Sequence, residues 1–353
     1  MLDIFKNWTK RYFSDPEAIV LLVLIFLILM LVLYMGSILA PVIASVVLAY
    51  LLQGLVNGLN VTKLPRFASV LIVYLGFLGI FLGVFLILGP LIWQQFVHLV
   101  AELPSMLKSA QQLLYLLPEK FPEYVTKENI DSFTMDMIQH MRVWGNALVS
   151  ASISSIPSLF MLIVYLVLVP LMVFFFLKDN NKIINWCTAF LPKERDLLSQ
   201  VWDDIDDQIG NYVRGKVLEV LIVGAVTYLF LIIFSVQYSV LLATLVGLSV
   251  LVPYVGAVVV TFPIVLVAYF QWGIGTQFTY ILIGYGIIQS LDGYVLVPLL
   301  FSEAVNLHPV AIIVAILFFG GVWGFWGVFF AIPLATVVKA VIDAWPRPHA
   351  MVA

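Results

Sequence analysis

The sequence predicts an all-α, polytopic membrane protein, on the strength of its composition and its long apolar runs. Of 353 residues, 63% are hydrophobic and only 10% are charged. A soluble domain of this length carries roughly 25% charged residues and cannot hide so much apolar surface in one core. The apolar runs are continuous rather than alternating, so the spanning elements are helices and not the strands of a barrel.

The N-terminal region predicts two short spans. Three basic residues among the first eleven precede an apolar run over 19–53. Because no polar mature sequence follows, we interpret the run as a retained anchor and not as a cleaved signal peptide. A helix over 19–53 would be about 52 Å long, whereas a hydrocarbon core is ~30 Å thick. We therefore expect a hairpin that turns near Gly36.

The rest of the chain alternates apolar and polar segments, which gives about eight transmembrane helices in all. Residues 1–94 hold the short hairpin and a long third span, and 95–155 form an external helical segment. The fourth span is 156–177, and a cytoplasmic amphipathic segment follows over 178–216. A four-span core (217–236, 239–271, 276–298 and 309–341) fills 217–341, and the tail is 342–353.

The distribution of basic residues predicts the orientation. With both termini in the cytoplasm, 13 of the 17 Lys and Arg residues lie inside, and the external segment 95–155 is net acidic. This agrees with the positive-inside rule. An extra span over 257–271 would instead move the C-terminal tail outside.

Several patterns suggest ligand sites and are better explained otherwise. Four aspartates between 203 and 207 lack the glycine turn and closing glutamate of a calcium loop, so a solvated helix face is favoured. Gly210, Gly215 and Lys216 have the spacing of a phosphate-binding loop, but Val217 replaces the required Ser or Thr. We expect Arg214 and Lys216 to extend to the membrane surface, with no nucleotide, cofactor or metal bound. A net charge of −3 gives no field for nucleic acid.

The candidate transport site is centred on Asp292, the one formally charged residue in 220–302. A buried carboxylate costs about 2.5–3.5 kcal/mol on insertion scales, so such residues face a partner, a bundle interior or a water-filled cavity. The sequence places Asp292 about 9 Å from the outer end of the span 276–298, where a gate residue is as plausible as a structural acid bonded near Asn306 or His308. Further pathway or coupling candidates are Gln289, Glu219 and the predicted break at Pro253, Tyr254 and Gly256. A break frees backbone carbonyls, and secondary transporters build sites from such discontinuous helices.

The C-terminal apolar block carries a second glycine pattern. Gly320, Gly321, Gly324 and Gly327 recur at spacings of three and four residues. Small residues at this spacing let two helices approach closely in a membrane. We expect helix packing there, with a gating hinge as the alternative.

The order of these segments resembles the AI-2E family of permeases, and within it the PerM branch. The resemblance is carried by residues 251–256, 292–298, 306–309 and the glycine run that ends at Pro333. It implies a multi-pass protein of the bacterial inner membrane that forms homo-oligomers. Some members of the family are assigned to export of autoinducer-2 and others to sodium/proton antiport.

Three functions remain open from the sequence. The first is a permease or exporter for a small hydrophilic solute, not driven by ATP. The second is a cation/proton antiporter in which Asp292 alternately binds a proton and a cation. The third is a non-transporting scaffold whose external helices hold a partner in the cell envelope. An enzyme is disfavoured, because the spans show no paired carboxylates, no metal-spaced histidines and no nucleophile beside a base.

Overall fold

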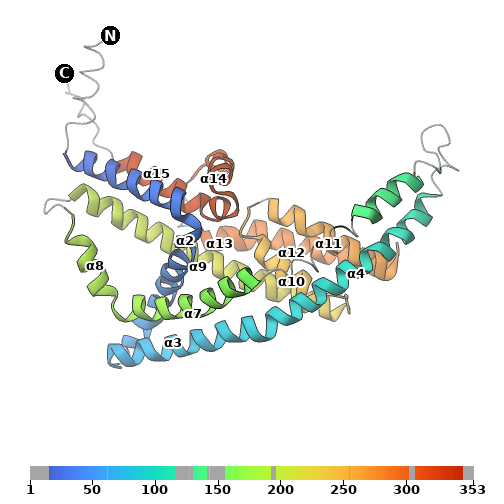
Figure 1. Ribbon diagram of the computed structural model, residues 1–353, viewed down its shortest axis with the longest axis horizontal. Coiled ribbons are helices and arrows are strands. Elements are labelled where there is room, and N and C mark those ends of the chain that lie inside the picture. The colour runs from blue at the N-terminus through green and yellow to red at the C-terminus, as the bar shows by residue number, and fades with distance from the viewer. Residues whose placement is uncertain are drawn as a thin grey trace, which may run out of the picture.

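A computed structural model gives the fold, and it describes residues 16–61, 63–115, 127, 130–140, 143, 156–191, 196–253, 255–301 and 307–344. Every regular element in these ranges is helical (Figure 1), which confirms the predicted all-α class. In chain order the helices are α2 (Pro16–Asn60), α3 (Arg66–Gly83), the π-helical η1 (Val84–Leu88), α4 (Gly89–Leu114), α7 (Ile156–Lys178), α8 (Asn180–Thr188), α9 (Asp196–Ile233), α10 (Ser239–Ser249), α11 (Val255–Trp272), α12 (Thr276–Leu291), the π-helical η2 (Asp292–Leu296), α13 (Val297–Phe301), α14 (Pro309–Phe329) and α15 (Ala331–Ala344).

Five helical stretches in the described residues are long and apolar enough to cross a membrane. They are Ile38–Asn60, Arg66–Met106, Leu198–Ile233, Val255–Trp272 and Thr276–Phe301. Helices α7 and α8, bent by 79° at their junction, make a sixth if counted as one span, and α10 and Pro309–Gly324 are shorter apolar helices. The chain is therefore a polytopic helical membrane protein, and the number eight stays a prediction.

Helix α2 corrects the predicted N-terminal hairpin. It runs as one 45-residue helix through Gly36 and is bent rather than folded back (Figure 1). The prediction was wrong because one glycine costs a helix only about 1 kcal/mol, whereas a turn in lipid would leave backbone groups without partners. The C-terminal part of α2 packs on α3 and α7 through a fully apolar cluster that includes Val56, Val173 and Leu177.

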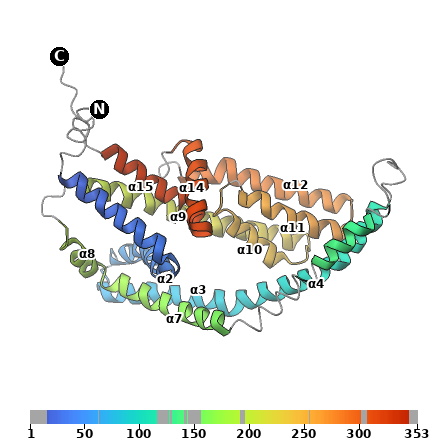
Figure 2. The same ribbon diagram turned by 45° about the horizontal axis from the view of Figure 1, so that its top comes forward.

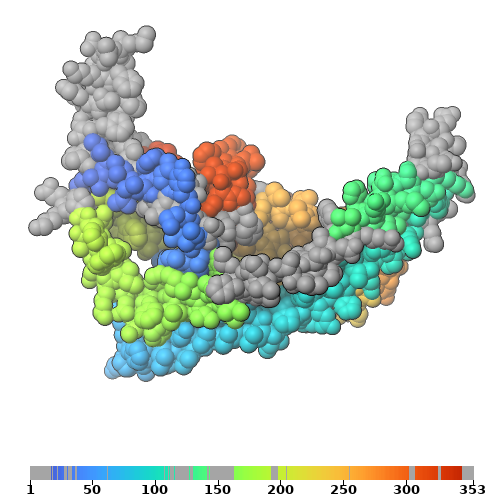
Figure 3. All heavy atoms as spheres, in the orientation of Figure 1, coloured from blue at the N-terminus to red at the C-terminus, as the bar shows by residue number. Residues whose placement is uncertain are grey.

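A long rod forms one edge of the molecule. Helices α3, η1 and α4 follow one another without a break from Arg66 to Leu114 (Figures 2 and 3). The helix thus continues past Gln95, where the sequence suggested that the external segment begins. At the end of α4, Gln111 Nε2 donates to Asp131 Oδ1 at 2.7 Å, and the Tyr115 hydroxyl bonds the same carboxylate. These bonds fasten the helical residues 130–140 to the rod.

The C-terminal half folds back on itself repeatedly. Gly224 on α9 and Gly247 on α10 face each other so closely that a Cβ on Gly247 would lie 3.1 Å from the Gly224 Cα. At the start of α10, Gln237 N donates to Gln271 Oε1 at 2.9 Å, and Gln271 Nε2 donates to Ser235 O at 2.8 Å. The end of α11 therefore lies beside the start of α10, so the two helices are antiparallel.

This arrangement corrects the prediction of one broken span over 239–271. The predicted break at Pro253 is present, but the chain reverses there and forms a helical hairpin. With 11 residues, α10 is about 16 Å long, about half the thickness of a hydrocarbon core. We call α10 and the turn over 250–253 the re-entrant hairpin tip. A Cβ on Gly256 would lie 1.8 Å from the Ser249 carbonyl oxygen, so the tight turn requires glycine.

The glycine run near the C-terminus makes a second reversal. Gly324 has a φ of +60° inside α14, and a Cβ on Gly327 would lie 1.8 Å from the Phe319 carbonyl oxygen. The run therefore bends the chain onto itself, and α15 then packs on α9, where Ile332 contacts a cluster with Tyr212 and Val213.

Candidate functional site

A buried ion pair lies on α9. Lys216 Nζ and Glu219 Oε2 are 2.7 Å apart, and the two side chains are 11% and 2% exposed. A spacing of three residues puts both on one helix face. An isolated charge at this position would be strongly destabilised, so each residue depends on the other.

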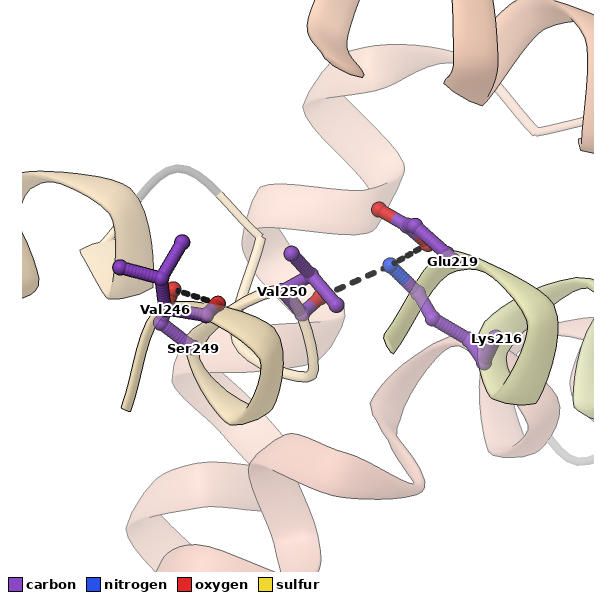
Figure 4. Close-up of polar contacts among 5 residues, drawn as sticks. All are labelled: Lys216, Glu219, Val246, Ser249 and Val250. Carbon is purple, nitrogen blue, oxygen red and sulfur yellow. Dashed lines mark hydrogen bonds and ion pairs between the residues drawn. The ribbon is translucent and has the colours of Figure 1, made fainter. Parts of the chain in front are cut away.

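The re-entrant hairpin tip completes the surroundings of Lys216. Its ammonium donates to the Val250 carbonyl oxygen at 2.8 Å, as Figure 4 shows. Val250 caps the C-terminus of α10, where carbonyls lack intrahelical partners. The ring of Phe301, the last residue of α13, lies 5.2 Å from the same ammonium. A Cβ on Gly215 would come within 2.7 Å of that ring, so glycine makes room for it.

The second half of the site comes from α12 and η2. Tyr285, Gln289 and Asp292 follow at intervals of four and three residues, which is one helix face. The π-helical turn η2, which begins at Asp292, packs against α9, the helix that carries Lys216 and Glu219. Asp292 Oδ1 and Gln289 Nε2 are buried and have no hydrogen-bond partner among the described residues. Asp292 also opens a π-helical turn, an irregularity frequent at functional sites.

Asp292 lies further from the end of its helix than the sequence suggested. The helix does not end at residue 298 but continues through α13, so the candidate span is Thr276–Phe301. At 1.5 Å per residue, Asp292 is about 24 Å from the first end and about 14 Å from the second. The end of the helix lies about 14 Å from Asp292 instead of the predicted 9 Å or so, because the π-helical turn and α13 extend the helix beyond Pro298.

The structure brings together most of the predicted site residues. Glu219, Gln289 and Asp292 lie on α9, α12 and η2. Pro253 belongs to the turn that begins at Val250, and Gly256 is the second residue of α11. His308 is exposed, and its Nδ1 accepts a hydrogen bond from Val310 N at the start of α14. Tyr254 and Asn306 lie outside the described residues.

Lys216 is the residue that sequence reasoning missed. It was expected at the membrane surface but is only 9% exposed, and its charge is directed toward Val250 and Glu219. The available signal was Glu219, one helical turn further on, because a carboxylate at that spacing can neutralise a buried lysine. The aspartates at 203, 206 and 207 are exposed, in keeping with the solvated face expected for them. Within the described ranges, no group of three His, Cys, Asp or Glu side chains could hold a metal ion.

Comparison with known proteins supplies the family. The model of the AI-2E family transporter matches residues 19–347. PerM of Escherichia coli (strain K12), whose name describes a permease, is 47% identical over 346 residues, 98% of each chain. YueF of Bacillus subtilis (strain 168), named as a transport protein, is 27% identical over 286 residues, 79% of this chain and 76% of YueF. The chain therefore belongs to the AI-2E family of transporters.

Proposed function

We propose that this transporter is a secondary permease for a small hydrophilic solute and that its coupling site is the cluster of Lys216, Glu219 and Asp292. The observation that carries the proposal is the buried Lys216–Glu219 pair bonded to the end of α10, with Asp292 on a helix that packs against α9. Intramembrane charges mark substrate or ion pathways, and half-helix ends supply their carbonyl ligands.

The contacts suggest how the site could respond to an ion. Lys216 and Glu219 lie on the same helix, so their pairing survives any movement of α9. The bond from Lys216 to the Val250 carbonyl, in contrast, joins α9 to the re-entrant hairpin tip. A change of charge at Asp292 alters the field at Lys216 and so the strength of that bond. Movement of the tip is then linked to protonation, and an ion gradient supplies the energy in place of ATP.

The folding of the C-terminal half supports a cytoplasmic C-terminus. Because α10 turns back before crossing, α9 and α11 end on one side, and α12 to α13 return to the other. The second reversal at Gly324 brings α15 against the N-terminal half of α9. We place this half of α9, and the C-terminus, on the cytoplasmic side of the bacterial inner membrane.

Cation/proton antiport is the second candidate, and the two carboxylates favour it. Glu219 is paired with Lys216, and Asp292 on the adjacent η2 is a second carboxylate, whose charge either a proton or a metal cation could neutralise. Exchange of the two would give antiport without a separate solute.

Flux in liposomes separates these functions. Purified protein is reconstituted with a pH-sensitive dye inside, and a gradient of autoinducer-2, sodium or potassium is imposed in turn. Solute permeation predicts that autoinducer-2 moves with protons and that Asp292→Asn abolishes the proton movement. Antiport predicts proton movement with sodium or potassium alone. Folded protein that moves none of them would contradict transport and favour a scaffold.

A further inference from the structure

The surroundings of the Lys216 ammonium are those of a bound monovalent cation. Its ligands are the Glu219 carboxylate at 2.7 Å and the Val250 carbonyl at 2.8 Å, with the Phe301 ring at 5.2 Å. Carboxylates, freed backbone carbonyls and aromatic faces are the groups that replace the hydration shell of such an ion. In this chain, they surround the end of a lysine side chain.

We propose that the Lys216 ammonium is a built-in cation that fills a latent sodium or potassium site, so that transport by this chain requires neither ion. The claim that transport requires neither ion rests on the function proposed above. The claim that the Glu219 carboxylate and the Val250 carbonyl form a cation site does not depend on that function.

Two observations support a cation site over a purely structural ion pair. A structural pair would be satisfied by its two members, yet Lys216 also binds a carbonyl of the reversing backbone, an oxygen suited to cations. Moreover, Asp292 lies at the start of η2, which packs against α9, and its Oδ1 atom is buried without a hydrogen-bond partner among the described residues. A second carboxylate therefore lies on a helix that packs against the one carrying Lys216 and Glu219.

The covalent tether restricts what this cation can do. Lys216 belongs to α9 and cannot cross the membrane, whereas a sodium ion at the same place could be carried across. The cation that is exchanged must then be bound elsewhere, and Asp292 is the free acid beside the site. We assign it a proton, so the chain is coupled to protons alone.

Removing the ammonium tests this inference directly. Lys216→Ala leaves the carboxylate and the carbonyl in place, and Lys216→Arg keeps a positive charge. The double variant Lys216→Ala with Glu219→Gln removes both charges. Each protein is purified in choline chloride, and radioactive sodium binding is measured, together with the midpoint of thermal unfolding in sodium chloride and in choline chloride.

Lys216→Ala is expected to bind one sodium ion per chain, and sodium should raise its midpoint by several degrees. The wild type, Lys216→Arg and the double variant should show neither effect. A folded Lys216→Ala protein that binds no sodium would overturn the proposal. So would sodium binding by the wild type that Glu219→Gln abolishes.

A folding defect does not remove the test. If Lys216→Ala is folded in sodium chloride but not in choline chloride, the latent site is supported. If Lys216→Ala is unfolded in both salts, sodium binding is measured on Lys216→Gln instead. Sodium binding by Lys216→Gln but not by the wild type would support the proposal, and the reverse would overturn it. Absence of autoinducer-2 flux, with the binding pattern as expected, would contradict the proposed permease function and leave the cation site intact.

Discussion

The two halves of the chain bury different kinds of side chain. Between α2, α3 and α7 the interior is apolar, with Val56, Val173 and Leu177 fully buried, and the buried Ser45 hydroxyl donates to the Pro41 carbonyl at 2.6 Å. Between α9 and α13 an apolar cluster is also present, but it adjoins Lys216, Glu219 and Asp292. The first half is held by packing and by the Ser45 hydroxyl, which also donates to Val169 O on α7 at 3.3 Å, and it buries no charged pair among the described residues; the second half also has to neutralise charge.

This difference assigns separate tasks to the halves. Apolar helices gain little by associating in lipid, so their contacts depend on van der Waals fit and tolerate small rearrangements. A buried charge does not tolerate such rearrangements, because its partners must remain within hydrogen-bond distance. The first half therefore suits a frame, and the second suits a site whose state depends on protonation.

The largest expected effect comes from breaking the ion pair. Glu219→Leu leaves the Lys216 ammonium buried with no carboxylate partner on α9, and loss of one partner of a buried pair costs about 3–5 kcal/mol. In the frame, Val173→Ala removes two methyl groups from a packed cluster, and the lost van der Waals contacts and the small cavity should cost roughly 1–2 kcal/mol. Thermal unfolding of the purified variants in nanodiscs measures the difference.

A double variant sharpens this comparison. Lys216→Met with Glu219→Leu replaces both charges by apolar groups, so stability should return to within about 1 kcal/mol of the wild type. Proton-coupled flux should remain absent. If Glu219→Leu alone were no less stable than Val173→Ala, the charges would not distinguish the two halves.

The next effect concerns the close approach of α9 and α10. A Cβ on Gly247 would lie 2.9 Å from the Val220 carbonyl oxygen, a backbone atom that cannot move alone. We expect Gly247→Ala to cost about 1–3 kcal/mol, as overpacking does. Gly286→Ala on α12 is the matched control, since no atom lies within 4 Å of the added Cβ. A similar loss of thermal stability in both variants would mean that the close approach is not what matters.

A smaller effect is expected where the obstacle is a side chain. A Cβ on Gly215 would meet the Phe301 ring, which can rotate away, so Gly215→Ala should leave stability nearly unchanged while uncovering the Lys216 site. With Cys187 replaced by Ser and a cysteine introduced at Ser249, the Gly215→Ala protein should react several-fold faster with a thiol reagent. Gly293→Ala, which meets no atom within 4 Å, should not change the rate. Equal rates in all three proteins would exclude Phe301 as a cover for the site.

The sequence alone identifies much of this site but not its geometry. Composition and apolar runs are enough to predict membrane helices, because lipid leaves the backbone no alternative. Asp292 is recognised because it is the one formally charged residue in 220–302, and Pro253 with Gly256 predicts the break. The residues around the break do not by themselves predict that the chain reverses its direction there. It depends on Gln271 reaching Ser235 and on Gly224 meeting Gly247, contacts that only the fold brings together.

The burial of Lys216 is likewise a feature that the local sequence does not predict. Its position at the start of an apolar run fits a lysine at the membrane surface equally well. Burial is decided by the Val250 carbonyl, which is 34 residues away and is free only because α10 ends there. A rule that searches for opposite charges one turn apart at the start of a span would have selected Lys216 with Glu219.

The smallest effect is expected outside both halves, where residues 130–140 join the end of α4. The hydrogen bond to Asp131 raises the pKa of the Tyr115 hydroxyl, aided by desolvation. Since the folded state holds this proton more tightly, the bond contributes to stability below about pH 10, the ordinary pKa of Tyr, and is lost as the pH rises through the raised pKa.

Spin labels at Ser109 and Met135 should therefore give one distance at pH 8 and a broader distribution at pH 11. Tyr115→Phe removes the titrating group, so its distribution should be the same at both values. A wild-type distance that does not change with pH would show that Tyr115 and Asp131 do not hold this segment, whereas the pairing of Lys216 with Glu219 would be unaffected by either result.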